Sequence, residues 1–215
     1  MNLFNADNMF FRGLGKLVDG VWLSLLFLFS CIPIITIGCA LTSLYYAVHK
    51  SLRHDRGYVG QEYRLAFRSN FKQATPIWIG ILLAAGLLFV DIKLLANTGG
   101  GTGYDYSGLT LAFKFMILAL AVWSLYLFPY MARFEDSRKD SMRNTAYMLI
   151  LHCPSTLLLF LNLAIFALIV AAFFPFPVFI LVPAFYTLVQ NRILEKVFYK
   201  RMSEEQRKKE KERYY

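Results

Sequence analysis

Long uncharged stretches alternate with short basic ones along this chain, and the alternation predicts membrane-spanning helices. Four windows contain no Asp, Glu, Lys or Arg: residues 20–48, 73–90, 115–132 and 144–191. A helix needs about 20 apolar residues to cross roughly 30 Å of hydrocarbon. The last window is too long for one crossing, and the Pro175-Phe176-Pro177 segment is expected to divide it. The pattern therefore predicts an all-α, polytopic membrane helix bundle with about five transmembrane helices.

The first window is longer than one crossing requires, and it contains both Pro33 and Gly38. Because proline removes a main-chain hydrogen bond, we expect one span that is broken between these two residues. Past the break, small residues recur four positions apart, a spacing that lets another helix approach closely. The residues assigned to this broken-helix and packing motif are Pro33, Thr36, Gly38, Thr42, Ser43 and Ala47.

The basic residues predict an orientation. Six Lys and Arg lie in residues 49–73, four in residues 133–143 and nine in residues 192–215. Residues 1–19 and residues 91–114 hold only two each. Cytoplasmic connections of membrane proteins are enriched in Lys and Arg. We therefore predict a multi-pass protein of the plasma membrane, with its N-terminus outside and its C-terminus in the cytoplasm.

Composition narrows the function classes. The 215 residues are 57% hydrophobic and carry a net charge of +9, which gathers beside the apolar spans. This distribution favours contact with the lipid bilayer and argues against nucleic acid. The three cysteines lie in apolar segments without metal-ligand spacing, and no catalytic motif occurs, so we expect no metal, no cofactor and no enzymatic activity. A single transmembrane domain is expected over residues 1–201, followed by a charged cytoplasmic helical tail over residues 202–215.

The basic connection after the first window has a helical period. Tyr63, Phe67 and Phe71 form one stripe, and basic side chains form the stripe beside it. This pattern predicts a cytoplasmic amphipathic helix that either rests on the inner leaflet or docks a partner protein. The residues assigned to this lipid or partner face are Arg64, Phe67, Arg68, Asn70, Phe71 and Lys72.

Three polar residues are the predicted intramembrane polar contacts. Asp91 and Lys114 flank the expected outer loop, and we expect them to pair across two spans. Asn162 lies near the middle of a predicted span. A polar residue at that depth is a candidate for function, and a hydrogen bond between helices is the simpler alternative.

Several short motifs point to a known family. They are Trp22, Leu26-Phe27, residues 33–38, Leu44-Tyr45-Tyr46, Lys50, Gly57-Tyr58, residues 67–75, Trp78, Pro129, Ala132-Arg133-Phe134 and Asn144. Together these residues resemble the YesL-like family of bacterial integral membrane proteins, a domain of unknown function. The resemblance implies a genomic context and no mechanism: such proteins tend to be encoded beside carbohydrate ABC importers and glycoside-degrading enzymes, largely in Gram-positive bacteria.

Two functions are compatible with these patterns. The first is a non-enzymatic accessory or assembly factor that contacts the subunits of a carbohydrate ABC importer. It is favoured over the permease itself because the chain lacks the Glu-Ala-Ala loop by which such permeases hold their ATPases. The alternative is a small homo-oligomeric solute carrier or channel, in which the break near Pro33 exposes main-chain carbonyls and Thr36 to a solute.

Overall fold

The computed structural model describes residues 9–55, 57–102, 107–172, 182–202, 204, 207 and 208, and nearly all of them are helical. In chain order the elements are α1 (Met9–Cys31), a 3-10 turn (Ile34–Thr36), α2 (Ile37–Ala47), a π-helical turn (Val48–Arg53), α3 (Val59–Thr102), α4 (Ser107–Arg133), α5 (Arg138–Leu151), α6 (Cys153–Ala172) and α7 (Val182–Arg201). The expected all-α architecture is confirmed. The predicted turn at Pro175 and most of the predicted tail, residues 202–215, lie outside the described residues.

Four helices contain segments that are long and apolar enough to cross a membrane. These segments are Gly13–Cys31 in α1, Val59–Asn97 in α3, Ser107–Arg133 in α4 and Pro154–Ala172 in α6. The expected class, a membrane protein with several apolar helices, is therefore supported. The α7 helix, which occupies the place of the predicted fifth span, is not among the four because charged residues interrupt its sequence.

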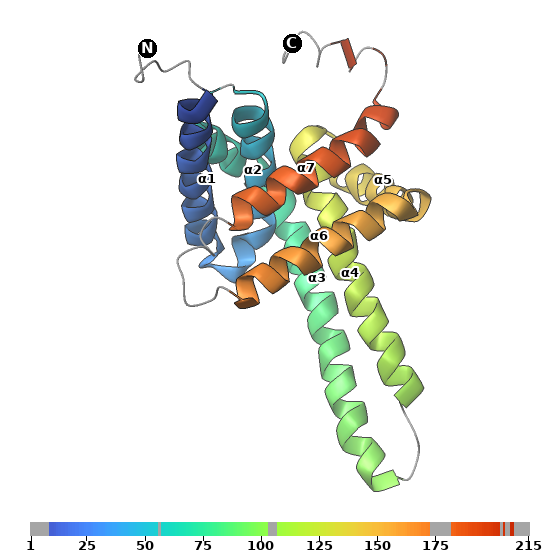
Figure 1. The fold of residues 1–215 in the computed structure, drawn as a ribbon. Helices are drawn as coiled ribbons and strands as arrows, with labels where there is room; N and C mark the ends of the chain where they lie inside the picture. Colours follow the sequence, from blue (N-terminus) through green and yellow to red (C-terminus); the bar gives the residue numbers. More distant parts are fainter. Residues whose placement is uncertain are drawn as a thin grey trace, which may run out of the picture.

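The first predicted span is instead a helical hairpin, in which α1 and α2 run antiparallel (Figure 1). Lys16 Nζ lies 2.9 Å from Asp55 Oδ1, although 39 residues separate them. Leu23 of α1 packs with Val48 in one hydrophobic cluster. The break expected near Pro33 is present, but the chain reverses there instead of continuing in the same direction, so both ends of this segment lie on the same side of the molecule. An uncharged stretch of this length is compatible both with one long span and with two helices that fold back on each other. The absence of charge therefore does not distinguish the two arrangements.

The turn of this hairpin is made by the residues that were expected to break the span. Pro33 has an extended main chain (φ −77°, ψ 113°), so the chain leaves the helical path directly after α1. The hydroxyl of Thr36 donates to the carbonyl of Pro33 at 2.8 Å and also to the carbonyl of Ser30. These bonds close the turn and occupy the Thr36 hydroxyl.

The predicted cytoplasmic amphipathic helix and the second predicted span form one helix, α3. It has 44 residues and is therefore about 66 Å long, more than twice the thickness of the hydrocarbon core. Pro76 lies inside α3, where it leaves the carbonyl of Lys72 without its helical donor. Arg138 of α5 donates to this carbonyl at 2.7 Å. The proline thereby creates an acceptor that holds α5 against α3.

A second proline has the same consequence in α4. Pro129 leaves the carbonyl of Leu125 without its helical donor, and Gln190 of α7 donates to this carbonyl at 3.0 Å. The C-terminal end of α4 is also its most buried part, because residues 126–131 are all buried. Both interior prolines thus lie where another helix is attached.

The long last window folds into α5, α6 and α7, so its division differs from the prediction. The chain breaks at His152, whose main chain (φ −115°, ψ 48°) is not helical, and Pro154 lies in the first turn of α6. Figure 1 shows α6 and α7 side by side, crossing the helices of the body obliquely. In the described residues, this window therefore supplies one apolar helix of spanning length, α6.

The molecule has two regions of different character (Figure 1). The body contains α1, α2, the first half of α3, the end of α4 and α5 to α7, and its core consists of three hydrophobic clusters. The arm, defined here as residues 79–102 of α3 and residues 107–123 of α4, projects away from the body. Its exposed apolar side chains include Leu83, Leu87, Leu94, Leu109, Leu111, Phe115 and Leu118.

Candidate functional site

Helix α7 lies across other helices of the body, and polar contacts attach it to α1, α2 and α4. At its start, the main-chain N–H of Ala184 donates to Ser24 Oγ of α1 at 3.1 Å, which satisfies one of the donors that a helix N-terminus leaves without a partner. Farther along, Gln190 reaches α4. The buried positions of α7 mix polar with apolar side chains: Ala184, Thr187, Gln190, Asn191, Leu194, Glu195, Val197 and Phe198.

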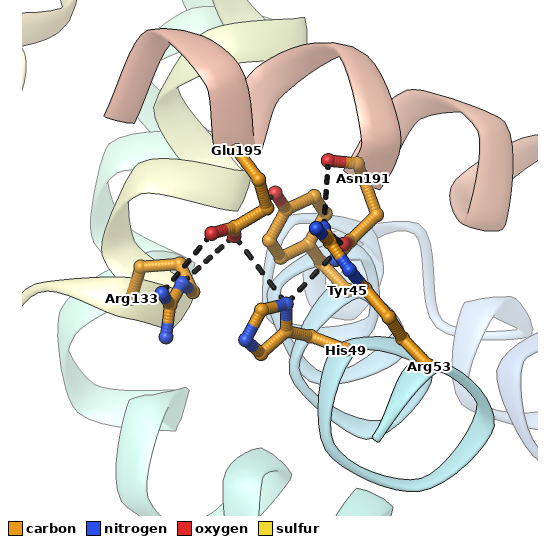
Figure 2. Close-up of polar contacts among 6 residues, drawn as sticks. All are labelled: Tyr45, His49, Arg53, Arg133, Asn191 and Glu195. Carbon is orange, nitrogen blue, oxygen red and sulfur yellow. Dashed lines mark hydrogen bonds and ion pairs between the residues drawn. The ribbon is translucent and has the colours of Figure 1, made fainter. Parts of the chain in front are cut away.

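Six polar residues meet at the buried side of α7, and Figure 2 shows how they face one another. Helical spacing explains their convergence: three recur every fourth residue through α2 and the π-helical turn, and two are four positions apart on α7. The sixth is the last residue of α4. This polar cluster consists of Tyr45, His49, Arg53, Arg133, Asn191 and Glu195.

Glu195 is the centre of the polar cluster. Arg133 donates to both carboxylate oxygens, from Nε to Oε1 at 2.8 Å and from Nη2 to Oε2 at 3.1 Å. The Tyr45 hydroxyl donates to Oε1 at 3.1 Å. Both charged side chains are more than 90% buried. A buried carboxylate is tolerated only when it is paired and hydrogen-bonded, and this bidentate geometry satisfies that requirement.

His49 lies between Asn191 and Glu195, the two residues that α7 contributes to the polar cluster. Its Nδ1 lies 3.2 Å from Asn191 Oδ1 and 3.4 Å from Glu195 Oε1, and both of these atoms are acceptors. Burial, followed by the positive charge of Arg133, lowers the pKa of His49 to about 2. The imidazole is therefore neutral, and the two acceptors assign its proton to Nδ1.

Arg53 completes the polar cluster from the exposed side. Its Nη1 donates to Asn191 Oδ1 at 2.6 Å. Within the described residues, Asn191 Nδ2 is buried without a hydrogen-bond partner. The described part of the chain contains no group of three or more His, Cys, Asp and Glu side chains that could hold a metal. The arrangement fixes α7 on α2 and α4 through charge-assisted hydrogen bonds.

The predicted packing residues all lie in or beside the hairpin, and four of them, Gly38, Thr42, Ser43 and Ala47, are buried. A side chain at Gly38 would bring a Cβ within 2.6 Å of Trp78 Cβ and 2.7 Å of Phe128, so only glycine lets α2 approach α3 and α4 this closely. The hydroxyls of Thr42 and Ser43 donate to carbonyls within α2. This surface is occupied by helices of the same chain.

The predicted lipid or partner face is split between the core and the surface. Tyr63 is 2% exposed, and Phe67 packs against two of the hydrophobic clusters. Phe71 is 41% exposed. The Asn70 amide donates to a carbonyl within α3. The basic side chains of the set remain exposed: Arg64, Arg68 and Lys72. The aromatic stripe thus belongs mainly to the core, and the basic stripe borders it.

The predicted pair of Asp91 and Lys114 does not form. Both side chains are exposed, and no ion pair joins them in the described part of the molecule. Asn162 of α6 is buried, but its Nδ2 has no hydrogen-bond partner among the described residues.

A second set of polar contacts fixes the loop between α4 and α5. Gln73 Nε2 donates to the main-chain oxygen of Asp136 at 2.7 Å. The Tyr130 hydroxyl donates to the Asp136 carboxylate, and Asn144 Nδ2 donates to the Tyr130 hydroxyl at 3.0 Å. Gln73 and Asn144 are two of the residues that carry the family resemblance, and the fold uses both as contacts between helices.

The residues of the polar cluster were not among the predicted site residues. Arg53 and Arg133 entered the prediction only as basic residues of connections, and Asn191 only as the end of an uncharged window. One signal was available: Asn191 and Glu195 are four positions apart and share a helix face with Leu194 and Phe198. A carboxylate on an apolar face predicts a buried cationic partner.

The fold and the apolar helices define the class: an all-α integral membrane protein. Residues 21–92 match the model of a protein family described as "Protein of unknown function, DUF624". This match is consistent with the resemblance to the YesL-like family, and it covers most of the α1–α2 hairpin and the greater part of α3. No curated protein and no solved structure matches the chain.

Proposed function

We propose that this protein is a non-enzymatic accessory or assembly factor of a carbohydrate ABC importer in a bacterial plasma membrane. Its body would lie at the cytoplasmic face and its arm would enter the bilayer beside the importer's own helices. The importer is chosen because the resemblance to the YesL-like family implies that genomic context. The observation that carries the proposal is the apolar arm.

The arm consists of two helices whose outer faces carry large apolar side chains. Leu87 is 68% exposed and Phe115 is 62% exposed. A Cβ built at Gly80, Gly86 or Gly108 meets no atom within 4 Å. In a membrane such a surface contacts lipid or the helices of another protein, and the three glycines permit close helix–helix approach. Two helices by themselves enclose no pathway, so this geometry favours an accessory over a carrier.

The alternative is a small carrier or channel. It requires a broken helix that exposes polar groups to a solute in the middle of the membrane. The break is a hairpin turn, and the Thr36 hydroxyl is already bonded to main-chain carbonyls. Homo-oligomerisation through the arm would be needed to build a pathway. The carrier therefore stays the second candidate.

The orientation is proposed from the hairpin together with the charge distribution. The contact between Lys16 and Asp55 places the start of α1 beside the basic connection, residues 49–73. Because basic connections are retained in the cytoplasm, the N-terminal end of α1 would lie in the cytoplasm too. This replaces the earlier expectation of an N-terminus outside the cell.

The proposal is tested by photo-crosslinking in the native host at natural expression level. A photoreactive phenylalanine analogue is placed at Leu87 or Leu111 in the arm, and at Leu127 as a buried control. Crosslinks from the arm positions to importer permease subunits, absent from the control position, are the expected result. Crosslinks only to lipid would remove the support for an importer partner. Crosslinks only to a second copy of this chain would favour the carrier.

A further inference from the structure

A groove lies between α1 and α3, beside the hairpin turn. Its volume is about 450 Å³, which is in the range of small-molecule sites. Leu26 and Phe29 of α1 line one side, and Phe67 of α3 lines the other. Two arginines of α3, Arg64 and Arg68, also line the groove. The groove therefore combines an apolar floor with two positive charges on one edge.

The two arginines differ from three other basic residues of the body, which are paired with carboxylates. Lys16 pairs with Asp55, Lys50 with Glu62, and Arg133 with Glu195. In the part of the chain that the structure describes, neither Arg64 nor Arg68 pairs with a carboxylate. They are four positions apart on α3, so their guanidinium groups project along the same edge of the groove. Their charge is available to an external anion.

The position of the groove relative to the membrane narrows the class of anion. Arg68 lies five residues before Gln73, where the uncharged window of α3 begins, a rise of about 7.5 Å along the helix. The polar interfacial layer of a bilayer is about 5–7 Å thick on each side. Phe29 is 70% exposed and continues the groove into the apolar surface of α1. The opening thus lies where lipid headgroups meet acyl chains.

We propose that this groove binds one anionic phospholipid, with the phosphate on Arg64 and Arg68 and an acyl chain along Leu26, Phe29 and Phe67. Two guanidinium groups suit a phosphate because each can donate two hydrogen bonds in a fixed plane. The apolar floor can contact an acyl chain. A soluble phosphate or an acidic peptide has no acyl chain to place there, so the floor favours a lipid. The site is independent of the importer proposal, because it requires lipid alone.

The test uses the full chain in mild detergent, titrated with phosphatidylglycerol or with phosphatidylcholine of the same acyl chains. Bound lipid is counted by native mass spectrometry, and the thermal midpoint is recorded in parallel. We expect one phosphatidylglycerol to bind saturably and to raise the midpoint, whereas phosphatidylcholine does so at least about tenfold more weakly, because it lacks the net negative charge. Equal binding of the two lipids would overturn the proposal. So would full competition by glycerol phosphate, which carries the anion without the acyl chains.

Variants assign the binding to the groove. The double change R64Q/R68Q should weaken phosphatidylglycerol binding at least about tenfold, because two charge-assisted contacts are lost. The matched control is K72Q, which removes an exposed charge from the same helix outside the groove and should change the affinity less than about twofold. An equal loss in both variants would show general attraction to the basic surface and would contradict a specific site. If the double variant does not fold, the comparison of the two lipids on the unaltered protein still decides.

Discussion

Both halves of α3 carry apolar side chains, but these side chains have different surroundings. The first half contacts α1, α2 and α4, so that Tyr63, Ala74 and Ile77 belong to hydrophobic clusters. The second half lies in the arm beside α4, where Leu83 and Leu87 are largely exposed. Hydropathy reports how apolar a helix is, and it does not report whether protein or lipid covers it. Specific contacts between side chains hold the helices of the body together, whereas the arm exposes an apolar surface to lipid or to another protein.

The same contrast applies to polar groups. In the body, Arg133 and Glu195 form a buried ion pair. In the arm, Asp91 and Lys114 are exposed and do not pair with each other. Substitutions in the body should therefore change stability, whereas substitutions in the arm should change association.

The largest expected effect is on thiol labelling, which reports the side of the membrane on which the ends of α1 and α3 lie. In a variant whose three cysteines are replaced, single thiols are introduced by Lys16→Cys, Tyr58→Cys or Asn97→Cys and labelled with an impermeant reagent. The hairpin predicts that positions 16 and 58 react from one side and position 97 from the other. Labelling of positions 16 and 58 from opposite sides would restore the single crossing that the sequence alone predicted.

The next largest effect is expected from Glu195→Gln in the polar cluster. This change leaves Arg133 buried without a counter-charge, so we expect a loss of about 3–5 kcal/mol in the free energy of unfolding. Thermal unfolding in detergent measures it, and Lys72→Gln, at an exposed position outside the groove, serves as the control. A midpoint equal to that of the control would mean that the polar cluster does not fix α7.

Glycines in the two regions give a matched pair of substitutions. Gly38→Ala places a Cβ against Trp78 and Phe128, and we expect it to destabilise the body by about 1–3 kcal/mol through overpacking. Gly80→Ala meets no atom within 4 Å and should be neutral, or stabilising by up to about 1 kcal/mol through helix propensity. Similar midpoints for the two variants would contradict the close approach at Gly38.

A pH effect follows from His49, which lies outside the four apolar segments. Its pKa is lowered in the folded protein, so below the ordinary pKa of about 6.5 the unfolded chain binds a proton that the folded chain does not. Stability therefore rises with pH across this range and falls as the pH drops. We expect a loss of about 1.4 kcal/mol for each pH unit between roughly pH 6 and pH 5. His49→Gln should remove this slope, and an unchanged slope in the variant would assign it to another group.

The smallest effect is expected in the arm. Leu87→Ala removes an exposed side chain and should change the free energy of unfolding in detergent by less than about 0.5 kcal/mol. The matched control, Leu127→Ala, removes the same atoms from a fully buried position and should cost about 2–5 kcal/mol. A large loss at Leu87 would show that the arm packs against other parts of this chain.

Several features could be predicted from the sequence because they depend on local properties. The uncharged windows predicted apolar helices, and α1, α3, α4 and α6 contain segments of spanning length. The spacing of small residues marked the surface around Gly38 where helices approach most closely. Pro33 marked a break in the helix. Each of these is a property of neighbouring residues.

Other features could not be predicted because they depend on direction and distance. A proline in an apolar stretch permits a kink or a reversal, and only the packing of Leu23 on Val48 shows that the chain reverses. The partners of Glu195 come from helices that lie up to 150 residues away in the chain. No local pattern links Tyr45 to Glu195.

The sequence by itself determined that this protein is an all-α membrane protein with basic connections and a broken first apolar window, because composition and period decide which helices form. The tertiary structure decided that this window is a hairpin, that the aromatic stripe of α3 is core, and that α7 is held by a buried ion pair. The physical reason is that burial and pairing are properties of contacts between helices. Those contacts join residues that are far apart in the sequence, so they become visible only once the chain is folded.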